Sequence, residues 1–259
     1  MQLIVPALNE EARLPRTLAV LRAFQLSAKE SAGPLEVIVV DNGSTDATAQ
    51  LARAADSLAM PVHVISCELK GKGAAVRAGV AHSTADVVGF MDADCATDLS
   101  ALAEGARLLS AGADVAVASR AVAGSVTTER HSRVRALGAT LYRRCTQQIA
   151  PGIADTQCGF KMFRGALARE VFAQTRSDGF SFDVEVLGRA QRRGARIVEF
   201  PAVWNDVPGS TFLPFRHGAS TFWELAVIAR RLRRTPATTP VPRLVSEPAP
   251  LALLPAVEA

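Results

Sequence analysis

Short apolar runs rich in valine and isoleucine alternate with amphipathic segments over the first 120 residues of the chain. Apolar runs of four to eight residues bounded by polar positions predict strands that are buried on both faces. The segments between them carry apolar residues at helical spacing. The predicted strands are Leu3–Val5, Leu35–Val40, Val62–Ser66, Val87–Met91 and Val115–Ala118, and the predicted helices are Glu10–Phe24, Thr45–Ala55, Ala74–Ala81 and Leu99–Leu109. This alternation predicts an α/β fold with a mostly parallel central sheet flanked by helices.

The pattern changes after residue 120. A basic helical stretch over 131–149 is followed by a glycine-punctuated segment over 155–165, a helix near 183–193 and a strand near 197–203. We expect this half to complete the site and to form one domain with the first, over residues 1–234. Six prolines between Pro236 and Pro255 predict a flexible tail over residues 235–259.

Composition narrows the class of protein. With 49% hydrophobic and 21% charged residues among 259, the chain is globular rather than disordered. It contains neither 18 consecutive apolar residues nor a charged and apolar leader, so we expect no membrane-spanning helix and no signal peptide. The four cysteines form no C-x-x-C pair and the four histidines show no ligand spacing, so we expect a reduced, cytoplasmic setting without zinc.

The basic charge is concentrated near the C-terminal end. Five arginines and one glutamate lie between Arg216 and Arg234, which equals the net charge of +4 for the whole chain. An apolar stripe at helical spacing accompanies them: Phe222, Leu225, Ala226, Ala229 and Leu232. Residues 217–234 therefore predict a basic interfacial helix at a membrane surface, with a packed core helix as the alternative. Aromatic residues do not alternate with the basic ones, so no nucleic acid is expected as a partner.

Polar clusters follow three of the predicted strands. They are the segments 6–10, 41–46 and 92–94, and the ordinary interpretation of each one alone is a turn or a helix cap. In doubly wound sheets, however, ligands bind at the carboxyl ends of the strands. Asp92 and Asp94 would face the same way in an extended segment and would repel each other unless a cation joined them. Oxygen ligands favour Mg²⁺ or Mn²⁺ there.

A glycine-rich basic turn precedes the third predicted helix. In Lys70-Gly71-Lys72-Gly73, glycine at a helix N-terminus would let backbone N–H groups approach a phosphate, although a solvated loop explains the turn almost as well. With the carboxylates and with Arg120 after the fifth strand, the turn predicts a site for a diphosphate ester chelated by a divalent ion.

Taken together, these segments resemble the family 2 glycosyltransferases of the GT-A fold. The later segments Asp155-Thr156-Gln157-Cys158-Gly159-Phe160-Lys161 and Phe182-Asp183-Val184-Glu185 look like the subgroup of dolichyl-phosphate β-glucosyltransferases and their bacterial polyprenyl-phosphate relatives. The resemblance implies that a hexose, most often glucose, moves from a UDP-sugar to polyprenyl phosphate with inversion. It implies a peripheral enzyme of the cell envelope, at the cytoplasmic face of the membrane.

The resemblance also implies roles for individual residues. The positions that match the nucleotide-sugar site are Pro6, Ala7, Asn9, Glu10, Asp41, Lys72, Gly73, Asp92, Ala93 and Arg120. Asp41 would accept from a uracil N–H, and Asp94 would bind the metal. Arg133, Arg135 and Lys161 would hold the acceptor phosphate, with a structural ion pair as the other role for Lys161.

The acceptor decides whether a general base is needed. A phosphate monoester is largely dianionic at neutral pH and attacks without one, whereas a sugar hydroxyl requires a carboxylate within hydrogen-bond reach. The catalytic candidates are Asp94, Asp155 and Asp183, and the last two could serve a hydroxyl acceptor or act only as cap or helix-face charges. The alternatives are a soluble family 2 enzyme with a hydroxyl acceptor, a GDP-mannose donor, and a basic protein that binds lipid headgroups or nucleic acid without catalysis.

Overall fold

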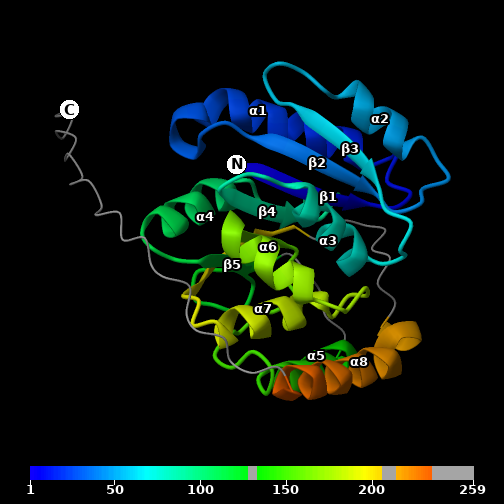
Figure 1. Cartoon of the computed structure of the whole chain (residues 1–259), viewed down its shortest axis with the longest axis vertical. Helices are drawn as coiled ribbons and strands as arrows, with labels where there is room; N and C mark the ends of the chain where they lie inside the picture. The colour runs from blue at the N-terminus through cyan, green and yellow to red at the C-terminus, as the bar shows by residue number, and fades with distance from the viewer. Residues whose placement is uncertain (128–132, 206–213, 235–259) are drawn as a thin grey trace.

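The computed structural model describes residues 1–127, 133–205 and 214–234, arranged around a seven-stranded sheet (Figure 1). The strand order is β3-β2-β1-β4-β7-β5-β8, and β7 runs antiparallel to both of its neighbours while the other pairs are parallel. The strands are β1 (Gln2–Ala7), β2 (Glu36–Asp41), β3 (Val62–Ser66), β4 (Val87–Met91), β5 (Val115–Ser119), β7 (Phe160–Arg164) and β8 (Ile197–Pro201). Two short strands, β6 (Val126–Thr127) and β9 (Val203–Trp204), form a second sheet. The predicted α/β fold with a mostly parallel sheet is confirmed.

Helices cover both faces of the main sheet. They are α1 (Leu14–Ala32), α2 (Thr48–Ala54), α3 (Lys72–His82), α4 (Ser100–Ser110), α5 (Arg133–Thr146), α6 (Gly165–Gln174), α7 (Phe182–Arg192) and α8 (Pro214–Arg234). One apolar core joins the sheet to α1, α2 and α4, and a second joins it to α3, α6 and α7. Leu3 and Ile4 of β1 are both buried, one in each core, which explains why the strand is a continuous apolar run.

A third apolar cluster holds α5 and α8 against the outer side of α7, at the lower end of Figure 1. From α8 it takes Leu225, Ile228 and Leu232, each almost fully buried. Burial of such a side chain is worth on the order of 1.5–3 kcal/mol. Two residues of the stripe predicted to enter a membrane, Leu225 and Leu232, therefore face the protein interior. They pack in one cluster with Val184 of α7.

Two elements of the second half differ from the prediction. The segment 155–165, interpreted as glycine-punctuated, contains β7, which inserts between β4 and β5, and the following residues form α6. Lys161 in the middle of β7 breaks the apolar pattern that marks a central strand, so the pattern gave no strand there. The proline-rich tail over 235–259 lies outside the described residues.

Candidate active site

Polar side chains gather at one edge of the main sheet, where the parallel strands end. Asp41 is the last residue of β2, Asp92 follows β4, and Arg120 follows β5. Strand β1 lies between β2 and β4; the helix after β1, α1, covers one face of the sheet, and the helix before β4, α3, covers the other. Such a topological switch point is where doubly wound sheets bind their ligands. The structure thus brings the predicted strand-end residues to one edge.

The loops after β1 and β2 are fastened to each other. The Asn9 backbone N–H donates to Ser44 Oγ at 3.0 Å, and Asn9 Oδ1 accepts from the Thr45 N–H at 2.9 Å. Asn9 has a φ of 55°, a left-handed conformation that asparagine tolerates better than most residues. Asp41 Oδ1 accepts from the Ser44 N–H at 3.0 Å. These bonds make one wall from the two loops predicted to hold the nucleotide.

Three of the residues expected to contact the nucleotide are alanine or proline, whose side chains carry no polar group. Pro6 and Ala7 are the last residues of β1 and pair with Val40 and Asp41 of β2. Ala7 and Ala93 are buried, and the Ala93 carbonyl accepts from Thr17 Oγ1. A ligand at this edge would meet mainly backbone atoms at these positions.

The glycine-rich turn is clamped between β2 and the segment that precedes α7. Asn42 Oδ1 accepts from the Gly71 N–H at 2.8 Å, and the Gly73 N–H donates to the Asp178 carbonyl at 2.8 Å. A Cβ on Gly73 would lie 2.6 Å from the Phe182 Cβ, so only glycine fits there. This corrects the expectation of a backbone phosphate cradle at Gly73, because its N–H already has a protein acceptor. The turn instead presents the Lys72 side chain.

Lys72 and Asp92 form an ion pair across the edge, with Nζ 2.5 Å from Oδ1. Burial acts to lower the pKa of Lys72, but the carboxylates of Asp92 and then Asp183 outweigh it and raise that pKa. The ammonium is therefore charged at neutral pH. On the other side of Asp92, Gly159 packs directly against the carboxylate, in space that any side chain would fill.

Asp94 and Glu10 face the same part of the edge. Both Glu10 oxygens accept from the Arg13 guanidinium at 2.6 Å, and Asp94 Oδ1 accepts from the Ala96 N–H at 3.1 Å. Burial, and next the charge of Asp92, raise the pKa of Asp94. A cation at Asp94 would offset both effects.

The donor set fits a divalent ion that is completed by its substrate. Mg²⁺ is usually held by one or two carboxylates together with substrate phosphates and water. Among the described residues, no group of three or more His, Cys, Asp or Glu is placed to hold a metal alone. Because Asp92 is engaged by Lys72, Asp94 is the carboxylate best placed to bind Mg²⁺ or Mn²⁺.

Asp155 is not an isolated carboxylate, because it forms an ion pair with Arg120. Its oxygens accept from Arg120 Nε at 2.7 Å and Nη2 at 3.0 Å, and the guanidinium also lies 4.9 Å from the centre of the Trp204 ring. Burial would raise the pKa of Asp155, but the Arg120 hydrogen bonds outweigh burial and lower it. Asp155 is thus ionised and bound, and Arg120 is oriented by two neighbours.

Asp183 is likewise bound, in a completely buried pair. Lys161 Nζ lies 2.6 Å from Asp183 Oδ1 and 2.7 Å from the Cys158 carbonyl, and none of its surface is exposed. Of the two roles predicted for Lys161, the structure shows the ion pair. The neighbouring carboxylate Glu185 accepts from Arg189 and from two backbone N–H groups before α7, so it too is engaged.

The two arginines predicted for the acceptor lie on α5. Arg133 and Arg135 belong to its first turn, and their side chains are outside the described residues. Farther along, α5 packs against α8. At the far end of α8, Arg230, Arg233 and Arg234 are exposed, and they line a hollow that also contains Gln148.

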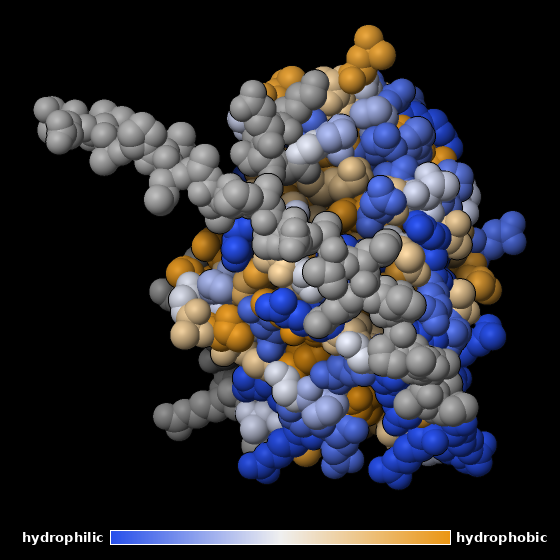
Figure 2. Space-filling model, turned by 60° about the vertical axis from the view of Figure 1, so that its left-hand side comes forward, coloured by the Kyte–Doolittle hydropathy of each residue, from blue (hydrophilic) through white to orange (hydrophobic). Residues whose placement is uncertain are grey.

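The outer surface of α5 and α8 combines basic and apolar side chains. The Trp223 side chain is 74% exposed and Leu141 is 52% exposed. Figure 2 shows hydrophilic side chains projecting at the end of the molecule where these helices lie. No helix within the described ranges is long and apolar enough to cross a membrane.

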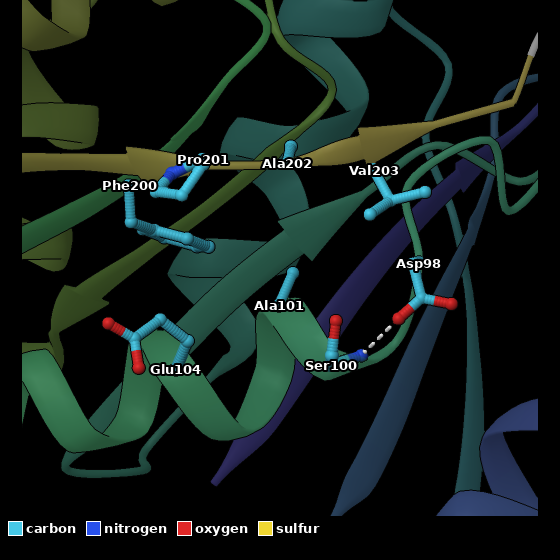
Figure 3. Close-up of a pocket in the computed structure, with 8 residues that line it drawn as sticks. All are labelled: Asp98, Ser100, Ala101, Glu104, Phe200, Pro201, Ala202 and Val203. Carbon is cyan, nitrogen blue, oxygen red and sulfur yellow. Dashed lines mark hydrogen bonds between the residues drawn. The ribbon is translucent and has the colours of Figure 1, made fainter. Parts of the chain in front are cut away.

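A second hollow lies between α4 and the segment from β8 to β9 (Figure 3). Its two carboxylates are already bonded, Asp98 to the Ser100 N–H at 2.9 Å and Glu104 to Arg107 at 2.7 Å. It contains none of the residues predicted for the site, so the strand edge is the candidate active site.

Three residues of the site carried no assigned role in the sequence. Arg13 binds Glu10, Trp204 lies against Arg120, and Gly159 packs on Asp92. The i, i+3 spacing of Glu10 and Arg13 was a usable signal on its own. The contacts of Trp204 and Gly159 join segments far apart in the sequence, which no local pattern reveals.

Comparison with known proteins identifies relatives over most of the chain. The sequence profile of glycosyl transferase family 2 matches residues 2–172. The dolichyl-phosphate beta-glucosyltransferases of Drosophila melanogaster and Homo sapiens are 34% and 33% identical, each aligned over 83% of this chain and 70% of its own length. The Trichomonas vaginalis protein ALG5A is 30% identical, over 81% of this chain and 67% of its own. The chain spans about two thirds of the length of these relatives.

Solved structures share the fold at lower identity. Glucosyl-3-phosphoglycerate synthase from Mycobacterium tuberculosis in complex with UDP superposes with a TM-score of 0.62 at 19% identity, covering 98% of this chain and 88% of that one. The same enzyme with Mn²⁺, UDP-glucose and phosphoglyceric acid gives a TM-score of 0.62, covering 98% and 87%. This likeness concerns the architecture, and it confirms the predicted GT-A fold.

Proposed function

The chain belongs to glycosyl transferase family 2, and on that basis we propose that it transfers glucose from a UDP-sugar to a polyprenyl phosphate with inversion at the anomeric carbon. The relatives named as dolichyl-phosphate beta-glucosyltransferases support the donor sugar and the class of acceptor. The structure contributes a separate argument, which concerns the general base.

The observation that carries the choice of acceptor is that three carboxylates considered as a base in the described part of the chain are each paired with a cation. Asp155 is bound by Arg120, Asp183 by Lys161, and Glu185 by Arg189. A hydroxyl acceptor needs a carboxylate that can take its proton within hydrogen-bond reach. A phosphate acceptor is already anionic at neutral pH and needs none. The pairing therefore favours polyprenyl phosphate over the hydroxyl acceptor of the soluble alternative.

On the donor side, the chain's own groups would position the nucleotide and balance charge. We propose that the joined loops at Asn9 and Asp41 hold the base and ribose, that Lys72 lies near the diphosphate, and that Asp94 holds Mg²⁺ or Mn²⁺. The bound ion would supply neutralisation of the departing UDP. The protein would also align the acceptor phosphate with the UDP-sugar for in-line attack. Holding both reactants in place converts a bimolecular step into an effectively unimolecular one.

On the acceptor side, we propose that Arg133 and Arg135 bind the lipid phosphate. Arg120, oriented by Asp155 and Trp204, lies at the same edge as the donor groups and offers further positive charge toward them. Arginines at both sides would offset the repulsion between the acceptor phosphate and the diphosphate.

We further propose that the protein works as a peripheral enzyme at the cytoplasmic membrane face. The exposed Trp223 and the arginines at the end of α8 support contact with anionic lipid, each basic residue near such a surface being worth about 1 kcal/mol. Leu225 and Leu232 of the apolar stripe do not take part, since they are buried in the cluster with Val184 of α7.

The direct test is transfer of radiolabelled glucose from UDP-glucose into organic-extractable polyprenyl phosphate, with Mg²⁺ or Mn²⁺. We expect metal-dependent labelled lipid from the wild type and a loss of about 100-fold or more in Asp94→Asn. Asp86→Asn is the matched control, because exposed Asp86 lies at the opposite end of β4 from Asp92. If UDP binds but no lipid is labelled, the acceptor or donor is wrong, and sugar hydroxyls and GDP-mannose become the next substrates to assay.

A further inference from the structure

Four charged groups from four parts of the chain form two neighbouring ion pairs at the donor edge, one partly exposed and one buried. Asp92 follows β4, Lys72 begins α3, Asp183 lies in the first turn of α7, and Lys161 is in the middle of β7. The Asp92–Lys72 pair is separated by 2.5 Å and the Asp183–Lys161 pair by 2.6 Å. The signs alternate, and the four charges sum to zero.

The two pairs are adjacent because their neighbours in sequence are in contact. Gly73, the residue after Lys72, has no room for a Cβ against Phe182, the residue before Asp183. The Gly73 N–H is also tied to the Asp178 carbonyl of the same segment at 2.8 Å. In agreement, Asp183 contributes to raising the pKa of Lys72, after Asp92.

The second pair is expensive for stability alone. A buried pair of opposite charges is often no more stable than an apolar pair of the same volume. Lys161 has no exposed surface, and its ammonium is satisfied by Asp183 and the Cys158 carbonyl, with the Phe90 ring 5.3 Å away. Its presence is explained if the charge on Asp183 has to be balanced locally.

We propose that Lys161 is a positioning residue for the donor site: it supplies Asp183 with its own cation and so leaves the Lys72 ammonium on Asp92. Among the described residues, Lys72 is the next cation after Lys161 that acts on the buried Asp183 carboxylate, so without Lys161 this carboxylate would draw Lys72 away from the edge. Asp92 would then face the diphosphate unpaired, and Lys72 would be lost as a positive charge near the nucleotide.

Lys161 also reaches Asp92 through the backbone. Its Nζ holds the carbonyl of Cys158 at 2.7 Å, and the next residue, Gly159, packs on the Asp92 carboxylate. Loss of the ammonium would release this contact as well. Both routes lead to the same carboxylate.

The test is binding of UDP in the presence of Mn²⁺, measured by calorimetry on the full chain. The inference rests on the proposed function only in that UDP is taken as the donor nucleotide. The binding experiment contains no acceptor lipid. If the wild type failed to glucosylate lipid, this inference would therefore still stand or fall on its own result. For Lys161→Met we expect weaker UDP binding by about 10- to 100-fold, the usual size of an effect transmitted through a neighbour of a ligand. For Lys161→Met/Asp183→Asn we expect recovery to within about threefold of the wild type, because Lys72 would return to Asp92.

The single variant Asp183→Asn makes the inference testable even if Lys161→Met does not fold. It leaves Lys72 with Asp92 as its carboxylate, so we expect UDP binding within about threefold of the wild type. A purely structural pair would make the two single variants alike. Arg193→Met is the matched control, since it removes a buried cation that pairs with the exposed Glu170 at the other end of α7.

Three results would overturn the inference. They are wild-type UDP affinity in folded Lys161→Met, a double variant as weak as Lys161→Met, and a tenfold or greater loss in Asp183→Asn. Thermal melting of each variant verifies that the folded protein is being titrated.

Discussion

Arg120 and Asp155 are joined by three hydrogen bonds: the Arg120 backbone N–H, Nε and Nη2 all donate to the Asp155 carboxylate. One of these residues was predicted to face phosphate and the other to act in catalysis. Their pairing holds Arg120 at the sheet edge, and it argues against Asp155 as a proton acceptor.

Replacing Asp155 with asparagine should lower the free energy of unfolding by about 2 kcal/mol. Loss of one partner of a fully buried pair costs roughly 3–5 kcal/mol, and the partial exposure of Arg120 reduces that figure. We expect the loss of kcat to stay below the 10²- to 10⁴-fold range that removal of a general base produces. Urea unfolding and initial rates measure the two effects, and a larger fall in kcat with an unchanged structure would restore Asp155 as a base.

The same variant predicts a pH dependence. Arg120 lowers the pKa of Asp155 in the folded protein against the opposing effect of burial. The stability gained from this shift is therefore fully present above the unfolded pKa of about 3.9 and is lost as the pH falls through the lower folded value. The difference in unfolding free energy between the wild type and Asp155→Asn should be constant from neutral pH to about pH 5 and shrink below about pH 4. A difference that stays constant to pH 2.5 would contradict this assignment, and Asp86→Asn serves as the exposed control.

Cys95, the residue after Asp94, has an unusual backbone conformation. Its φ is 53°, in the left-handed region, directly after the residue that we propose to bind the metal. The free energy of unfolding of Cys95→Val should be about 1–2 kcal/mol lower than that of Cys95→Gly. A branched side chain is strained in the left-handed region, and glycine is not. Cys95→Val should also bind UDP with Mn²⁺ more weakly. Thermal melting and calorimetry compare the two variants, and equal values for both would show that the conformation carries no strain.

The arginines at the end of α8 should govern binding to anionic vesicles. Replacing Arg233 and Arg234 with serine should weaken sedimentation with phosphatidylglycerol vesicles by about 30-fold, from about 1 kcal/mol for each arginine. Arg22→Ser/Arg53→Ser makes the same change in net charge on α1 and α2, away from α5 and α8 in Figure 1, and should have little effect. Equal losses in the two double variants would reduce the effect to net charge and remove α8 as the docking surface.

The pattern of apolar positions was sufficient for the layout of the first 120 residues. Strands buried on both faces are read from runs such as 35–40, and the carboxyl ends of parallel strands necessarily meet at one edge. That is why Asp41, Asp92 and Arg120 could be placed together from the sequence. The resemblance in the sequence named the family that the comparisons confirm.

The tertiary structure decided which charges neutralise one another. Asp155 binds a residue 35 positions away, and Lys161 binds one 22 positions away, so neither partner follows from local spacing. Lys161 is also the reason that strand β7 was not predicted, because a lysine interrupts the apolar run of a central strand. It is accommodated there by the buried carboxylate of Asp183, which no local pattern reveals.

The sequence by itself determined the alternation of strands and helices and the residue types at the strand ends, since periodicity and turn chemistry are local. It could not say what covers an apolar stripe. On α8, Leu225 and Leu232 of the stripe are covered by protein, because Val184 of α7 and Ile149 pack against them in the folded chain. Which surface stays exposed, and which carboxylate stays unpaired, depends on contacts between distant segments, and only the folded chain contains them.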